Sequence, residues 1–261
     1  MDATFFDTLP DSIPEREKII LDVVARGEHD QIAWMAVFSK HGDKTGEMFV
    51  ASDALKIAGV RINATAVLTQ LIADATGHLP VPAHVLDLRH EQAGVKASPC
   101  PIDVSKPGAM EHMASVEWML THSLMVDGEI QKAREAGARP EDMIASTVGK
   151  VWLPLCNDLT MLSNLSVFPT GKTGAVNYGW HYPTSGMIQT KGHKHDRWHS
   201  DYSQLVVLML AEMLVDGVKM NVMDVAQDPA LAPLVMGLEG VLKIPRQPGV
   251  EFGDVAALSR S

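Results

Sequence analysis

The chain has little cysteine, no long apolar run and no concentration of basic residues. Its two cysteines, Cys100 and Cys156, are too few for a disulfide framework and do not form a Cys-x-x-Cys pair. The longest apolar run, 205–210, is far shorter than a membrane span. Lys and Arg total 22 against 32 Asp and Glu, which gives a net charge of −10. We therefore expect reduced thiols, no membrane span and no nucleic acid as a partner.

The fingerprints of nucleotide cofactors are also missing. There is no Gly-x-x-x-x-Gly-Lys-Ser/Thr loop and no Gly-x-Gly-x-x-Gly after a strand. The segment 168–174 contains Gly-Lys-Thr but lacks the upstream glycine, so it is interpreted as a turn. We expect no nucleotide or flavin cofactor. Gly-x-Ser-x-Gly and His-Glu-x-x-His are absent as well, so no standard hydrolase motif is present.

Hydrophobic periodicity predicts an α+β fold. Apolar residues at helical spacing predict a first helix ending near Gly27 and further helices over 64–76, 83–93 and 108–136, with Asn63 capping the helix over 64–76. Runs of β-formers predict strands over 31–39, 47–51, 150–155, 175–181, 186–190 and 203–211. The turn-rich segment 41–46 predicts a hairpin between the first two strands, and Asp216-Gly217 predicts a second hairpin turn.

This order places a helical segment, about 63–147, ahead of a β-rich segment, about 148–222. We therefore predict one compact α+β domain over 1–261. An antiparallel or mixed β-sheet would have the central helical segment packed on it.

Histidine clustering is the strongest chemical signal. Four of the eleven histidines, His181, His193, His195 and His199, fall within nineteen residues. Asp201, Tyr202 and Ser203 follow at once. A chance distribution would scatter these residue types, so the cluster marks the candidate site.

Zinc chemistry is one interpretation of the cluster. His195 and His199 would share one face of a helical turn, and Asp201 would add a carboxylate. Zinc held by such a set keeps an open position for water and lowers the pKa of that water. In this hypothesis His181 is either a fourth ligand or the general base, and Tyr202 donates a hydrogen bond to the oxyanion.

A serine nucleophile is the second interpretation. Ser203 would attack, His195 or His181 would serve as its base, and Asp201 would orient the imidazole. Trp180 and Trp198 flank the cluster and are candidate substrate-binding residues. A purely structural role competes with both, because histidines beside aromatic residues often only satisfy their own hydrogen bonds.

The chain resembles a family of uncharacterised bacterial and phage-borne proteins. The resemblance rests on Tyr178-Gly-Trp-His181, on His195 and on Asp201-Tyr-Ser203, and extends to Phe49–Leu55. It implies no activity, because none is known for the family, but it supports the location of the site. The acidic start of the chain predicts no signal peptide. We expect a cytoplasmic location, or the host cytoplasm for a phage-encoded chain.

Two classes of function follow. The first is a hydrolase of an amide or ester bond, for example a metal-dependent peptidase or amidase acting on a peptide or cell-wall polymer. A Ser-His-Asp hydrolase using Ser203 is a variant of this class. The second is a non-enzymatic binding or structural protein, such as a virion or assembly component. The sequence leaves a homo-oligomer open in either case.

Strand pairing predicts where the site residues lie. If the strands ending at His181 and starting at Ser203 share a sheet, with 186–190 between them, His181, His195 and Asp201 converge within about 8 Å. Trp180 and Tyr202 would then face the opposite side and anchor the sheet on the helical layer.

Overall fold

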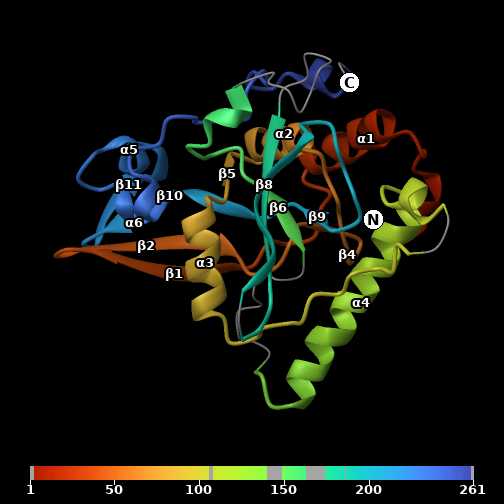
Figure 1. Ribbon diagram of the computed structural model, residues 1–261, viewed down its shortest axis with the longest axis horizontal. Coiled ribbons are helices and arrows are strands. Elements are labelled where there is room, and N and C mark those ends of the chain that lie inside the picture. Colours follow the sequence, from red (N-terminus) through yellow and green to blue (C-terminus); the bar gives the residue numbers. More distant parts are fainter. Residues whose placement is uncertain (1–2, 106–107, 140–148, 163–173, 185, 260–261) are drawn as a thin grey trace.

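The fold is α+β, with helices packed around two antiparallel or mixed sheets (Figure 1). The computed structural model describes residues 3–105, 108–139, 149–162, 174–184 and 186–259. Its helices are α1 (Ile13–Ala25), α2 (Ala66–Thr76), α3 (Ala83–Gln92), α4 (Val116–Glu135), α5 (Val222–Gln227) and α6 (Pro233–Met236). Short 3-10 turns are η1 (Ala3–Thr8), η2 (Ala109–His112), η4 (Leu159–Leu162), η5 (Gly237–Glu239) and η6 (Val255–Ser259).

The first sheet has the strand order β1-β2-β10-β11, and β5 pairs with β10. Its strands are β1 (Trp34–His41), β2 (Lys44–Ala51), β5 (His78–Pro80), β10 (Leu208–Val215) and β11 (Val218–Asn221). The two hairpins predicted from turn-rich segments, β1–β2 and β10–β11, are confirmed. Asp216 at the second turn has a φ of 50° and Gly217 a φ of 79°, which is the backbone that a two-residue turn requires.

The second sheet has the order β8-β7-β6-β9, and only β6 and β9 run parallel. Its strands are β6 (Lys150–Trp152), β7 (Gly174–His181), β8 (Met187–Asp196) and β9 (Gln204–Leu205); β3 (Lys56–Ile57) and β4 (Val60–Arg61) form a separate hairpin. The sequence analysis expected the strand over 186–190, which corresponds to β8, to lie between β7 and β9. That expectation was wrong, because β6 lies between β7 and β9, and β8 is the edge strand.

Caps and glycines end the helices. Thr65 caps α2, since its Oγ1 accepts a hydrogen bond from Leu68 N at 3.0 Å, and Gly77 ends α2 with a φ of 68°. The predicted cap, Asn63, instead donates from Nδ2 to the carbonyl of Asp201 at 3.2 Å. It therefore ties the start of α2 to the second sheet.

One hydrophobic cluster joins the two sheets. It contains Val37 and Met48 of the first sheet, Val151 and Tyr178 of the second, and Leu86 of α3. Figure 1 shows α3 in front of the sheets and α4 along the opposite side of β6 and β9. The helices of the predicted central segment thus flank the second sheet, in agreement with the α+β expectation.

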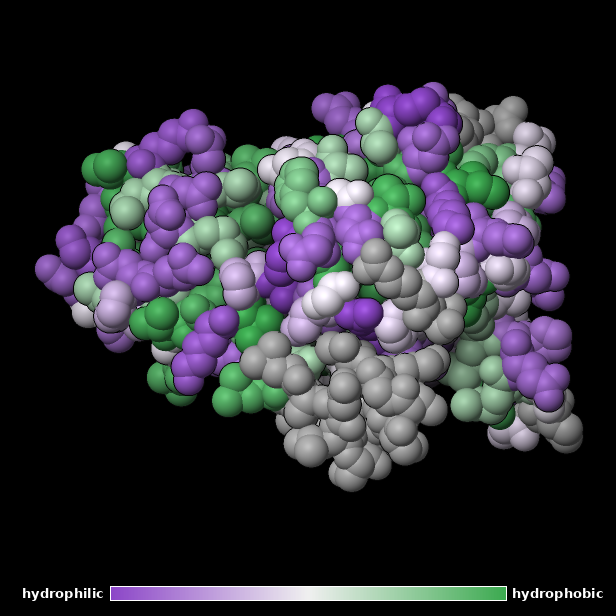
Figure 2. Space-filling model, turned by 90° about the horizontal axis from the view of Figure 1, so that it is seen from above, coloured by the Kyte–Doolittle hydropathy of each residue, from purple (hydrophilic) through white to green (hydrophobic). Residues whose placement is uncertain are grey.

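The outer surface is mixed in polarity. Among the helices of the described segments, none has the length and apolar character of a bilayer span. Figure 2 shows hydrophilic and hydrophobic residues interspersed in small areas on the face seen from above.

A buried carboxyl connects α1 to α2. Glu17 is only 3% exposed, and its two oxygens accept hydrogen bonds from Thr65 N at 2.7 Å and Thr65 Oγ1 at 2.8 Å. Burial raises the pKa of Glu17 to about 7, although the Thr65 hydrogen bonds and the charge of Arg16 act in the opposite direction. The protonated carboxyl is therefore favoured in the folded protein.

We predict that this carboxyl makes the protein less stable as the pH rises toward 8. Because the pKa is raised on folding, the stabilising contribution is complete below the unfolded value and is lost as the pH passes through about 7. The free energy of unfolding should fall by roughly 1–3 kcal/mol between pH 5 and pH 8, measured by urea denaturation. Glu17→Gln should flatten this dependence, whereas Glu15→Gln at an exposed position on α1 should not. Equal pH profiles for wild type and Glu17→Gln would contradict the assignment.

Candidate functional site

A cleft lies between α3 and the turn that connects β7 to β8. Its volume is about 420 Å³, and its polar lining comes from both elements. The polar residues are Asp87, His90, Glu91, Lys96, His181 and Thr184. The sequence had singled out His181 within this set.

An irregularity in β7 directs His181 into the cleft. The pairing of β7 with β8 shifts register between Asn177 and Gly179, and both Gly179 and Trp180 have positive φ, at 102° and 60°. In a regular strand, residues 178 and 181 would point to opposite faces. The irregularity turns Tyr178 and His181 to the same side, toward α3, and sends Trp180 to the other side.

Tyr178, His181 and Asp87 form one hydrogen-bonded unit. Tyr178 Oη donates to Asp87 Oδ1 at 2.7 Å, and His181 Nε2 lies 3.0 Å from the same oxygen. A carboxylate only accepts, so Nε2 carries the proton and Nδ1 keeps its lone pair. Nδ1 is buried and has no hydrogen-bond partner among the described residues. Burial, followed by the hydrogen bond and charge of Asp87, raises the pKa of Tyr178, which keeps its hydroxyl protonated.

His90 covers the imidazole of His181. The two rings stack at a centroid distance of 4.7 Å and an angle of 19°. Burial, followed by electrostatic interactions with His181 and Lys96, lowers the pKa of His90 to about 4. His90 is therefore neutral at pH 7.

Most of the other predicted site residues form a second cluster, on the far side of β7. Asp201 is 1% exposed, and its carboxylate binds Lys150 Nζ at 2.6 Å and Ser203 Oγ at 2.6 Å. Burial alone would raise the pKa of Asp201, but His199, Lys150 and Ser203 outweigh it and hold the pKa well below its usual range. His199 Nε2 is 3.8 Å from Asp201 Oδ2, an ion-pair separation that is too long for a hydrogen bond.

His195 and His199 stack on each other beside Asp201, with ring centroids 3.8 Å apart. The helical turn expected for them was wrong, because His195 lies on β8 and His199 in the turn that follows. Burial, with the charges of His199 and Lys150, lowers the pKa of His195 to about 4. The side chain of His193 lies outside the described residues.

This arrangement does not fit zinc. Both oxygens of Asp201 already have partners, Lys150 and Ser203. Within the described segments, no three His, Cys, Asp or Glu side chains form a group that could hold a metal ion. The predicted set of His195, His199 and Asp201 is therefore not formed as a ligand set, and we derive no step through a metal.

The predicted serine arrangement is also not formed. Ser203 is 1% exposed, and its hydroxyl donates directly to Asp201 Oδ1, with no imidazole between the two groups. Its backbone N–H donates to the same oxygen at 2.8 Å, so Asp201 orders the turn before β9. Ser203 thus has a structural partner in place of a base.

The aromatic residues around the cluster make structural contacts. Tyr202 Oη accepts from Ile102 N at 2.9 Å, and its ring contacts Trp180 and His122 of α4. Trp180 and Tyr202 contact His122 of the helical layer, as expected, but they do not face away from Asp201, because its partner Lys150 lies over the Trp180 ring. Trp198 Nε1 donates to the carbonyl of Ala257 at 3.0 Å, which fixes the C-terminal segment.

The contacts among the described residues do not join the three residues that were expected to converge. The described contacts of His181 are with Asp87, His90 and Tyr178, and none of them joins His181 to His195 or Asp201. Sequence reasoning missed Asp87, which lies far from the histidine cluster in the chain. Its signal was a polar stripe of Asp87, His90 and Glu91 at helical spacing, opposite the apolar face of α3.

Comparison with protein-family models, with curated proteins and with solved structures finds no match for this chain. The function is therefore argued from the site alone.

We predict that Asp201 is held by a structurally essential ion pair. Lys150→Met leaves a buried carboxylate without its cation and should lower the free energy of unfolding by about 3 kcal/mol, measured by urea denaturation at pH 7. Lys132→Met removes an exposed ion pair with Glu129 and should change the free energy of unfolding by less than about 1 kcal/mol. Equal effects of the two substitutions would show that the Lys150–Asp201 pair has no special role.

Proposed function

We propose that the protein is a hydrolase of amide or ester bonds that uses His181, oriented by Asp87, as its general base. The observation that carries the proposal is the Tyr178–Asp87–His181 unit at the edge of an open cleft. A carboxylate that receives the Nε2 proton fixes the imidazole tautomer and stabilises the imidazolium that forms when Nδ1 takes a proton. The substrate class that we propose is a peptide or a peptide-like polymer.

In this mechanism a water molecule has to displace the atoms that bury His181 Nδ1, and Nδ1 then removes a proton from that water as it attacks the carbonyl carbon. The proton then passes from Nδ1 to the leaving amine or alcohol, so the base returns to its starting state. Residue 179 controls the approach to Nδ1, because a Cβ at this position would lie 3.8 Å from that nitrogen. Glycine leaves this side of the buried ring without a covering side chain.

Two neighbours support the chemistry. Lys96 lines the cleft and supplies a positive charge that would stabilise the oxygen on which negative charge develops. His90, neutral at pH 7, covers one face of His181 and limits contact of the imidazole with water. Neither group requires a metal or an organic cofactor for this role.

We predict that Asp87→Asn and His181→Gln abolish hydrolysis without unfolding the protein. The asparagine removes the charge that stabilises the imidazolium, and the glutamine removes the base, so each should lower kcat/KM by about 10²–10⁴-fold. The measurement uses a panel of chromogenic esters and fluorogenic peptide amides, with thermal melting as a check on folding. His41→Gln, at an exposed position in β1, is the control for loss of a histidine and should keep full activity.

Turnover that survives in both cleft variants would place the reaction elsewhere. Turnover that is lost in Ser203→Ala but retained in His181→Gln would restore the serine mechanism.

The competing function is non-enzymatic binding. This alternative is favoured because four of the predicted site residues form hydrogen bonds within the fold, so their polar side-chain groups are already occupied. They are Asp201, Tyr202, Ser203 and Trp198. A wild-type protein that hydrolyses no member of the panel, yet binds a peptide probe less tightly after Asp87→Asn, would support this alternative.

A further inference from the structure

Arg89 points from α3 into the interior, away from the proposed active site. Residues two positions apart on a helix lie on nearly opposite faces, so Arg89 is directed away from Asp87. Its neighbours on the buried face are Val85 and Leu86, both in the hydrophobic core. The side chain of Arg89 is 0% exposed.

This guanidinium is not hydrogen-bonded to any of the residues that the structure describes. Nε, Nη1 and Nη2 of Arg89 are all unpaired in the part of the chain that the structure describes. Burial lowers the pKa of Arg89 to about 10, which still leaves it charged at pH 7. A buried charge without a partner strongly destabilises a folded protein, and buried charges are normally paired. A negatively charged group next to Arg89 would therefore stabilise the folded protein.

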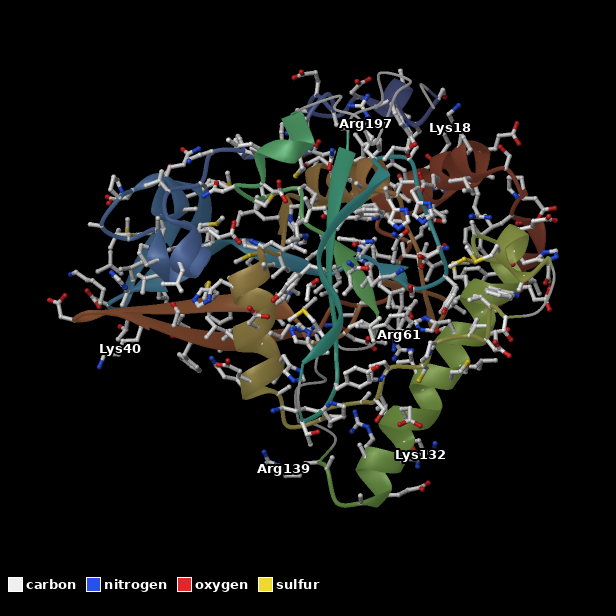
Figure 3. The ribbon with its side chains drawn as sticks, in the orientation of Figure 1. Lys18, Lys40, Arg61, Lys132, Arg139 and Arg197 are labelled. Carbon is white, nitrogen blue, oxygen red and sulfur yellow. The ribbon has the colours of Figure 1, made fainter. Side chains whose placement is uncertain are left out.

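The carboxylate that acts electrostatically on Arg89 is already bonded to other donors. Asp53 is the acidic group that acts electrostatically on Arg89. Its oxygens bind Arg61 Nε at 2.9 Å, Arg61 Nη2 at 2.7 Å and Lys56 Nζ at 2.7 Å. Figure 3 shows Arg61 in the middle of the molecule, beside α4. Lys56 and Arg61 are paired with the two carboxylates Asp53 and Asp127, which leaves the charge of Arg89 without a bonded counterion among the described residues.

A further unpartnered group lies in reach of the same ion pairs. His122 on α4 is 1% exposed, and neither of its ring nitrogens has a partner among the described residues. Arg61 acts on His122 electrostatically, just as Asp53 acts on Arg89. The Arg61–Asp53 pair thus connects two buried groups with unused hydrogen-bonding capacity.

We propose that this interior binds a small oxyanion, a carboxylate or a phosphate, with the Arg89 guanidinium as its principal ligand. The planar fork of N–H donors on a guanidinium matches two oxygens of either ion. The site is separate from the cleft, because Arg89 and Asp87 project from opposite faces of α3. Since Arg89 is fully enclosed, the ion enters while the protein folds or when α3 moves, and exchange is slow.

The test compares refolding with and without the ion. Wild type is refolded from urea in Tris with chloride as the only anion, or at equal ionic strength with inorganic phosphate or acetate. Phosphate or acetate should raise the wild-type melting temperature by about 3 °C or more, with saturation. A response to phosphate alone identifies a tetrahedral ion, and a response to acetate alone identifies a carboxylate.

Arg89→Met carries the decisive comparison. It removes the charge but keeps an unbranched side chain, so it should melt at or above wild type in chloride and should not respond to either ion. Arg26→Met, which alters an exposed arginine directly after α1, should respond as wild type does. Failure of both ions to shift wild type, or an equal shift in Arg89→Met, would overturn the proposal. If Arg89→Met does not fold, equilibrium dialysis of refolded wild type with labelled phosphate and acetate decides, and absence of saturable binding refutes the site.

Discussion

The left-handed backbone at Gly179 and Trp180 determines which side chains meet on each face of the second sheet. Trp180 adopts a φ of 60°, which costs a non-glycine residue about 1 kcal/mol or more. Contacts of its ring with His122, Tyr202 and Lys150 offset that cost. The same irregularity places Tyr178 and His181 against α3. A regular strand would break one of these two sets of contacts.

The two faces of β7 therefore have different chemical character. On the α4 side, Asp201 is saturated by Lys150 and Ser203, and the surrounding rings are packed into the interior. On the α3 side, Asp87 and His181 meet at an accessible cleft, and the imidazole keeps one unpaired nitrogen. The first arrangement stabilises the turn before β9, and the second is the one suited to moving a proton. This division is why the proposed reaction is assigned to His181 and not to Ser203.

Local patterns predicted much of the fold. The hairpins β1–β2 and β10–β11 follow from alternating strands around turn residues, and α2 and α3 follow from helical spacing with glycine or proline at their ends. Histidine clustering located β7 and β8 as the region of interest. The insertion of β6 between β7 and β9 was not predictable, because it pairs residues more than fifty positions apart.

The site was only half predictable for the same reason. His181 was identified from its own neighbourhood, but its partner Asp87 lies 94 residues earlier in the chain. Nothing in the local sequence distinguishes a register shift at Asn177–Gly179 from a regular strand, so the separation of His181 from Asp201 required the three-dimensional structure. Likewise, burial of Arg89 depends on tertiary packing, since its position on α3 is also compatible with a surface residue.

The most direct test of the account is nitrogen NMR of the His181 imidazole. Because Asp87 accepts from Nε2, the neutral ring should show a protonated Nε2 and an unprotonated Nδ1 at pH 8. Replacement of Asp87 by asparagine should change this tautomer, whereas the signals of His195 should stay unchanged. A wild-type His181 with its proton on Nδ1, or one unaffected by the change at Asp87, would contradict the orientation on which the proposed chemistry depends.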